Sequence, residues 1–278
     1  MNDFYLGIYE KATPPDISWQ ERLTAIKEAG YNFMEISIDE SDIRLERLNW
    51  STDKRYELLR ISQDIGLPIR TMCLSGHRKY PLGSEDPAKV KQSLEIIDKA
   101  IDFAADMGIR IIQLAGYDVY YEESTESTRK RYMENIHLFA EMASQRSVIM
   151  GLETMETPFM NTVQKAMQVV NEVNSPYLNV YPDTGNITNA IDDIEEDILT
   201  GRGKIVAAHL KETVPNVFRN LSFGDGHVDF VKAIQVYKSI GVNMFNAEFW
   251  YNKNKDWKKE IKHSIDFLTD KYIEATNS

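Results

Sequence analysis

Short apolar runs alternate with longer amphipathic stretches along the whole chain. Eight runs of four to six mostly apolar residues are typical of β-strands, and each is followed by a stretch with apolar positions at helical spacing. The expected strands are Phe4–Tyr9, Phe33–Ile38, Ile69–Cys73, Ile111–Leu114, Ile149–Leu152, Leu178–Tyr181, Ile205–Ala208 and Met244–Ala247. The expected helices are Trp19–Ala29, Thr52–Ile65, Pro87–Met107, Thr125–Arg146, Thr162–Val173, Ile191–Leu199, Val228–Ile240 and Asp256–Tyr272.

Helix-start and helix-stop residues agree with this division. Ser18 is followed three residues later by Glu21, and Asn161 by Gln164, which is the pattern of a helix N-terminus. Glycine is the residue that most often ends a helix. Four glycines stand where a helical pattern ends and the next apolar run begins: Gly30, Gly66, Gly108 and Gly241.

The alternation of strands and helices predicts the fold class. It implies a parallel sheet, and the continuously apolar strands imply that both faces of the sheet are covered. Eight strand–helix units in about 250 residues suit a closed barrel, so we expect an α/β protein with a single (β/α)₈ TIM barrel domain over residues 1–278. An open doubly wound sheet is the alternative, weakened by the lack of a G-x-G-x-x-G turn or a P-loop.

Composition and charge limit which kinds of partner and which kinds of site the protein can have. The formal net charge is −11, which argues against nucleic acid as a partner because binding phosphate backbones needs a basic surface. The one cysteine, Cys73, excludes an intrachain disulfide and a Cys-rich zinc site. No apolar run is long enough to span a bilayer, and the first residues do not resemble a leader peptide. We therefore expect a cytoplasmic protein with no membrane partner.

Polar side chains end four consecutive predicted strands. Glu153, Asp183, His209 and Glu248 follow the fifth, sixth, seventh and eighth apolar runs. In a (β/α)₈ barrel the reactive groups come from this end of the strands. Three carboxylates placed together would repel one another unless a cation neutralised them. With one imidazole, they form a ligand set for one divalent metal ion such as Mn²⁺, Mg²⁺, Co²⁺ or Zn²⁺. Asp183 alone has a second interpretation as a helix cap.

Two of these carboxylates also predict acid–base chemistry. Glu153 and Glu248 belong to different strands, so they can approach a chelated ketose from different sides. The metal would polarise the ketone and stabilise an enediolate. Proton removal by one glutamate and return by the other would invert carbon 3, whereas transfer by one base on one face would isomerise ketose and aldose. Spacing alone leaves both reactions open.

Several longer motifs resemble a known enzyme family. These motifs are Leu6–Ala12, Met72–Arg78, Pro81–Asp86, Ile112–Tyr121, Tyr181–Asn186 and Phe223–Phe230. In them the chain resembles the bacterial L-ribulose-5-phosphate (L-xylulose-5-phosphate) 3-epimerases of L-ascorbate and L-xylulose catabolism. Some of these enzymes are labelled hexulose-6-phosphate isomerases, and they are xylose-isomerase-like TIM barrels. The resemblance implies that Glu153, Asp183, His209 and Glu248 bind the metal and that Glu153 and Glu248 are the catalytic pair.

Two positions depart from the pattern of the wider superfamily. Related free-ketose 3-epimerases have a histidine three residues after the metal aspartate and an arginine six after the metal histidine. This chain has Asn186 and Pro215 there, so the usual contacts with substrate oxygens are altered.

A sugar phosphate also needs groups that hold its phosphate. Rim cations and backbone amides are suited to this task. His77 lies on the same rim, where it contacts substrate or satisfies loop carbonyls. The candidate substrate-binding residues are His77, Arg78, Lys79, Gly116, Tyr117 and Lys211.

Other functions compete with the epimerase interpretation. The same metal site could serve an aldose–ketose isomerase acting on a hexulose 6-phosphate. A DNA-repair endonuclease of a related barrel would need several metal ions and a basic groove. A non-catalytic sugar-phosphate binding protein would not need two opposed carboxylates. The sequence also leaves open whether the chain acts alone or as a homodimer.

Overall fold

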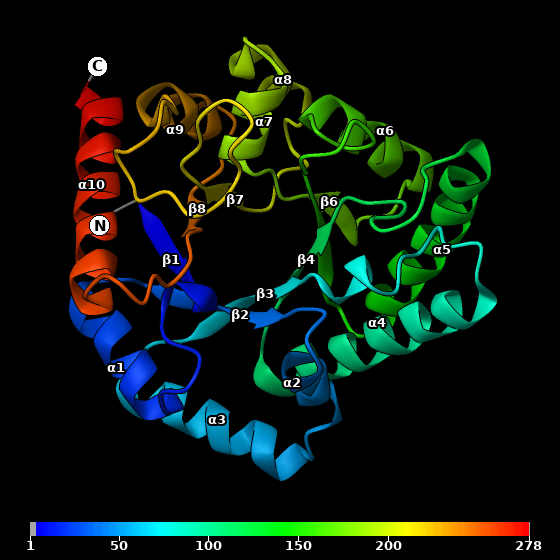
Figure 1. The fold of residues 1–278 in the computed structure, drawn as a ribbon, viewed down its shortest axis with the longest axis horizontal. Coiled ribbons are helices and arrows are strands. Elements are labelled where there is room, and N and C mark those ends of the chain that lie inside the picture. The colour runs from blue at the N-terminus through cyan, green and yellow to red at the C-terminus, as the bar shows by residue number, and fades with distance from the viewer. Residues whose placement is uncertain (1–3, 278) are drawn as a thin grey trace.

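The computed structural model describes residues 4–277, and its parallel strands form the centre of the molecule (Figure 1). Eight strands within these residues lie in the order β6-β5-β4-β3-β2-β1-β8-β7. Their bounds are β1 Tyr5–Tyr9, β2 Phe33–Ile38, β3 Ile69–Leu74, β4 Ile111–Ala115, β5 Ile149–Glu153, β6 Leu178–Val180, β7 Ala208–Leu210 and β8 Met244–Ala247. Residues 1–3 and 278 of the expected domain lie outside the described residues.

The sheet closes on itself between β6 and β7. Single parallel bridges join Val180 to Ile205 and Asp183 to His209. Two of the hydrogen bonds across this gap run from Val206 N to Val180 O at 3.0 Å and from His209 N to Pro182 O at 2.9 Å. This closure confirms the expected barrel and brings the ends of β5 to β8 to one rim.

Helices surround the strands on the outside, as Figure 1 shows. The larger ones bury one apolar face each against the barrel, for example Ile97, Ile101 and Ala104 of the helix after β3. The α-helices are α1 Trp19–Ala29, α2 Asp42–Leu45, α3 Thr52–Ile65, α4 Pro87–Met107, α5 Glu126–Gln145, α6 Val163–Val173, α7 Thr184–Ala190, α8 Ile194–Thr200, α9 Phe230–Ser239 and α10 Trp257–Asn277. Short 3₁₀ helices span Glu10–Ala12, Glu46–Asn49 and Gly76–Arg78.

Most element boundaries agree with the sequence pattern. Ser18 caps α1 by accepting a hydrogen bond from Glu21 N, and Gly30 ends this helix in the left-handed conformation that glycine adopts without strain. The start expected at Asn161 was wrong by one residue, because Thr162 caps α6 through Lys165 N.

The region around β7 departs from the expected pattern. The expected strand Ile205–Ala208 was placed too early, since β7 is Ala208–Leu210 and Ile205 makes one bridge. Helix α7 was not expected, because its residues are largely polar or small.

None of the helices in residues 4–277 combines the length and apolar character needed to cross a membrane.

Candidate metal and substrate site

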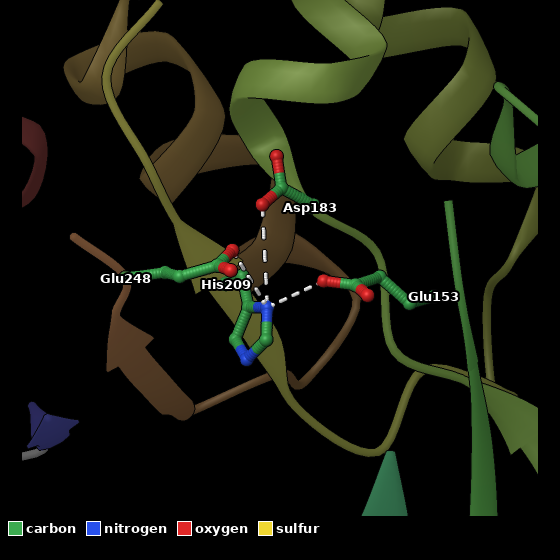
Figure 2. Close-up of side chains that lie close together, drawn as sticks. All are labelled: Glu153, Asp183, His209 and Glu248. Carbon is green, nitrogen blue, oxygen red and sulfur yellow. Dashed lines mark hydrogen bonds and ion pairs between the residues drawn. The ribbon is translucent and has the colours of Figure 1, made fainter. Parts of the chain in front are cut away.

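Four side chains from neighbouring strand ends meet at one rim of the barrel, as Figure 2 shows. Glu153 is the last residue of β5, His209 lies in β7, and Glu248 directly follows β8. Asp183 precedes α7 and caps it by accepting a hydrogen bond from Asn186 N at 2.6 Å. Each residue offers one ligand atom, and these atoms all lie within 4.8 Å of one another.

The imidazole of His209 lies at the centre of this cluster. Its Nδ1 is 2.8 Å from Glu153 Oε1, 3.1 Å from Glu248 Oε2 and 4.0 Å from Asp183 Oδ2 (Figure 2). All four side chains are buried. Among the described residues, neither Asp183 Oδ2 nor Glu248 Oε2 receives a well-aligned hydrogen bond, although the nitrogens of His209 and Lys211 lie close to both. Buried carboxylate oxygens in need of positive charge suit a bound cation, so this donor set fits one divalent metal ion.

Lys211 places a positive charge beside the carboxylates of Asp183 and Glu248. Its buried Nζ lies 2.9 Å from Asp183 Oδ2 and 3.8 Å from Glu248 Oε2. It also donates a hydrogen bond to Asn186 Oδ1 at 2.8 Å. Burial opposes the charge on Lys211, but Asp183 and Glu248 outweigh burial and raise its pKa. Lys211 therefore remains charged beside the carboxylates.

The two candidate catalytic glutamates differ in their electrostatic surroundings. Burial raises the pKa of Glu153, despite its contact with His209. Burial also acts to raise the pKa of Glu248, but Lys211 and His209 outweigh it and hold that pKa well below its usual value. Carboxyl groups whose pKa values are pushed apart are suited to act as an acid and a base.

A cavity of about 130 Å³ adjoins the cluster. Glu153, Glu248 and Lys211 line it, and Tyr9 and Trp250 provide aromatic surface. Their rings meet edge to face with centroids 6.2 Å apart. The remaining lining residues are Lys11, Cys73, Ser75, Arg78, Met155, Glu156, Asn186, Phe218 and Arg219.

Arg78 is the expected phosphate contact whose side chain can still donate a hydrogen bond into the cavity. It lines the cavity, its carbon Cζ lies 5.7 and 5.3 Å from the ring centroids of Tyr117 and Tyr120, and its buried Nε has no hydrogen-bond partner in the described residues. Burial acts to lower its pKa, but Tyr117 and Glu156 outweigh burial and raise it. The guanidinium is therefore charged and can donate to an anion.

Four other expected substrate contacts lie outside the cavity lining. His77 turns away, with Nε2 3.2 Å from Ser93 O and its ring packed on Phe139. Lys79 is exposed, 3.6 Å from Asp42. The amide of Gly116 donates to Glu153 O at 3.2 Å, so it is not free for a phosphate. Tyr117 lies beneath Arg78, where its hydroxyl donates to Glu156 Oε2.

The two departures from the superfamily pattern have different surroundings. Asn186 is buried, where its Nδ2 donates to Thr154 O at 2.8 Å and its Oδ1 accepts from Lys211. Pro215 is exposed, yet Arg219 of the same loop lines the cavity and lies 3.0 Å from Glu156 Oε1. Arg219 was not expected from the sequence, because it does not directly follow a strand.

Glu212 fixes the far end of this loop. Its carboxylate accepts hydrogen bonds from Gly224 N at 3.0 Å and Val228 N at 3.2 Å. A Cβ at Gly226 would overlap this carboxylate and the carbonyl of Thr213, so the close approach requires glycine. The motif Phe223–Phe230 therefore anchors the loop that carries Phe218 and Arg219.

Comparison with known proteins identifies a family and similar enzymes. The profile of the xylose isomerase-like TIM barrel family matches residues 23–271. The chain is 42% identical over 271 residues to L-ribulose-5-phosphate 3-epimerase UlaE of Escherichia coli (strain SMS-3-5 / SECEC), covering 97% of this chain and 95% of the relative. The protein of the same name from Escherichia fergusonii is 42% identical over the same shares.

Solved structures share the fold at lower identity. The D-allulose 3-epimerase of Methylomonas sp. in complex with D-allulose superposes with a TM-score of 0.80 at 18% identity, covering 97% of each chain. D-psicose 3-epimerase with D-tagatose, from Clostridium cellulolyticum H10, gives a TM-score of 0.81 at 17% identity, with 97% of this chain and 99% of that chain covered. At such identities the likeness concerns the fold.

Proposed function

The chain belongs to the xylose isomerase-like TIM barrel family, and from this premise we propose that it is a 3-epimerase that interconverts L-ribulose 5-phosphate and L-xylulose 5-phosphate. The observation that carries the proposal is the pair Glu153 and Glu248. These two cavity-lining carboxylates come from different strand ends and belong to the cluster that fits a divalent ion. The relatives named L-ribulose-5-phosphate 3-epimerase support the choice of substrate.

Glu153, Asp183, His209 and Glu248 would hold the ion. Mn²⁺, Mg²⁺, Co²⁺ and Zn²⁺ are the candidates, since oxygen ligands with one imidazole suit all four. When bound, the ion would neutralise the crowded carboxylates and polarise the C2 ketone of the substrate. The described geometry supports this role because Asp183 Oδ2 and Glu248 Oε2 are buried beside each other and receive no well-aligned hydrogen bond from the described residues.

Glu153 and Glu248 would exchange the proton at carbon 3. The α-proton of a ketose is acidic enough to be removed once negative charge on the neighbouring oxygen is stabilised. One glutamate takes this proton from one face, and the other returns a proton to the opposite face, which inverts the carbon. Lys211 is buried beside Asp183 and Glu248, and it supplies a fixed positive charge next to their carboxylates.

We assign the phosphate to the arginine side of the cavity. Arg78 Nε is a donor without a partner among the described residues, and a guanidinium can bind two phosphate oxygens at once. Arg219 lies on the same side, paired with Glu156.

A phosphorylated substrate also supports a cytoplasmic location, because its charge opposes passage through a bilayer.

The product of the reaction tests this function against its alternatives. Metal-loaded protein is incubated with L-ribulose 5-phosphate, and the sugar is followed by NMR. Appearance of L-xylulose 5-phosphate is expected. Formation of an aldose would instead establish an aldose–ketose isomerase. Faster turnover of a hexulose 6-phosphate than of L-ribulose 5-phosphate would support the same alternative. Binding without turnover would establish a sugar-phosphate binding protein.

Replacing Arg78 tests the phosphate assignment separately. Arg78→Met is expected to lower kcat/KM for L-ribulose 5-phosphate by about 10- to 100-fold, because a hydrogen bond to a charged group contributes about 1.5–3 kcal/mol. The residual turnover of unphosphorylated L-ribulose should change far less. Lys79→Met is the matched control, since the neighbouring Lys79 is exposed and outside the cavity lining. An equal loss for both sugars would show that Arg78 does not contact the phosphate.

A further inference from the structure

Glu35 is a buried carboxylate behind the metal-binding cluster. It lies in the middle of β2, its side chain is 0% exposed, and its neighbours along the strand are apolar. It is not among the four clustered ligands. Burying a carboxylate is costly unless donors surround it, so its partners indicate why it is there.

Four side chains from four other strands or strand ends contact Glu35. On Oε1, the His209 Nε2 atom lies at 2.8 Å and the Asn246 Nδ2 atom at 3.0 Å. On Oε2, Thr71 Oγ1 donates at 2.7 Å and the Tyr181 hydroxyl at 3.0 Å. Three of these partners are neutral hydrogen-bond donors, and the fourth is the imidazole of the cluster.

The contact with His209 determines which ring nitrogen faces the cluster. Both oxygens of Glu35 accept hydrogen bonds from neutral donors, Oε1 from Asn246 and Oε2 from Thr71 and Tyr181. We therefore take Oε1 as the acceptor of the contact with His209 as well, with the hydrogen on Nε2. The other nitrogen, Nδ1, is the one that lies among Glu153, Asp183 and Glu248. Glu35 therefore holds the ring in the orientation and tautomer in which Nδ1 can be a ligand.

We propose that Glu35 is a positioning residue of the metal site, which orients His209 through Nε2 and increases the basicity of Nδ1 as a ligand. Carboxylates in this position behind metal-bound histidines act in this way in other proteins. The inference rests on the proposed metal site, but it is independent of the sugar substrate. Thr71, Tyr181 and Asn246 in turn hold the carboxylate in place.

Metal affinity measured without substrate tests the proposal. The dissociation constants of Mn²⁺ and Zn²⁺ are determined by competition with a chelating dye for the wild type and for Glu35→Gln. The variant keeps the side-chain volume and an acceptor oxygen but loses the charge. A loss of affinity of about 10- to 100-fold is expected, the size of effect found for such outer partners of metal ligands.

Glu10→Gln is the matched control. Glu10 is also 0% exposed and also forms buried contacts, with Arg47 at 2.7 and 2.8 Å, but its described hydrogen bonds and ion pairs include no residue of the cluster. This variant should lose stability in urea unfolding while its metal affinity stays within about threefold of the wild type. If the loss of any buried charge weakened metal binding, Glu10→Gln and Glu35→Gln would both bind the ion more weakly than the wild type.

Glu35→Asp provides a second measurement if Glu35→Gln does not fold. It keeps the charge but withdraws it from Nε2 by one methylene group, so it should bind the ion more weakly than the wild type. Wild-type affinity in a folded Glu35→Gln or Glu35→Asp variant would overturn the proposal. A wild type that binds metal but does not epimerise would reject the proposed function, and the affinity ratio would still decide the role of Glu35.

Discussion

Glu153→Gln and Glu248→Gln are each expected to lower kcat for epimerisation by about 10²- to 10⁴-fold, the usual contribution of a positioned acid or base. Each glutamine occupies the volume of the carboxylate but cannot accept the carbon-3 proton. Substrate binding should survive better than turnover, because the cavity keeps its cations and aromatic surface in both variants.

Hydrogen exchange with solvent distinguishes the two halves of the reaction. In deuterated water the wild type should place solvent deuterium on carbon 3 of the product, since the returning proton comes from a glutamate that exchanges with solvent. Each variant retains the base for one epimer. It should exchange the carbon-3 hydrogen of that epimer without inverting the carbon. Product is analysed by NMR and mass spectrometry.

Metal occupancy must be measured in both variants, because Glu153 and Glu248 are also proposed ligands. Glu156→Gln is the control within the same cavity: Glu156 lines the cavity but is not in the ligand cluster, so this variant should still invert carbon 3. Near-normal epimerisation by metal-loaded Glu248→Gln would disprove the assigned pair. Inversion without solvent label in the wild type would indicate a single shuttling base.

The position of the cluster could be predicted from sequence because a parallel barrel brings its strand ends to one rim. Glu153, His209 and Glu248 each follow or end a short apolar run, so the strand pattern located them without any contact information. Asp183 had two interpretations, a helix cap and a ligand. One carboxylate oxygen caps α7 and the other faces the cluster, so the geometry is compatible with both, and the ligand role stays a prediction.

Residues whose role depends on packing were not predictable in this way. Glu35 interrupts an apolar strand, which signals a buried charge, but its four partners come from strands far apart in the sequence. His77 lies beside Arg78 in the chain, and the short 3₁₀ turn at Gly76–Arg78 separates them, so that Arg78 enters the cavity and His77 does not. Loop conformation, which local pattern does not encode, decides such cases.

Removal of divalent ions is expected to abolish turnover. Charge stabilisation by a bound ion contributes several kcal/mol to such reactions, and about 4 kcal/mol corresponds to about a thousandfold in rate. Dialysis against a chelator should therefore leave background activity, and added Mn²⁺ should restore it. Circular dichroism before and after dialysis controls for unfolding. Full activity in protein shown by elemental analysis to be free of metal would reject the site.

Asp183→Asn tests the same site within the chain, and its effect on the fold can be separated from its effect on the ion. Asparagine caps helices about as well as aspartate, so α7 should keep the hydrogen bond from Asn186 N to the side chain at position 183. The substitution removes the negative charge that faces the cluster, while Lys211, 2.9 Å from Asp183 Oδ2, keeps its positive charge and then opposes a cation. We therefore expect nearly unchanged urea unfolding, a large rise in the dissociation constant for Mn²⁺, and turnover that recovers in part at high Mn²⁺. A variant that binds Mn²⁺ as tightly as the wild type would show that Asp183 is only a helix cap.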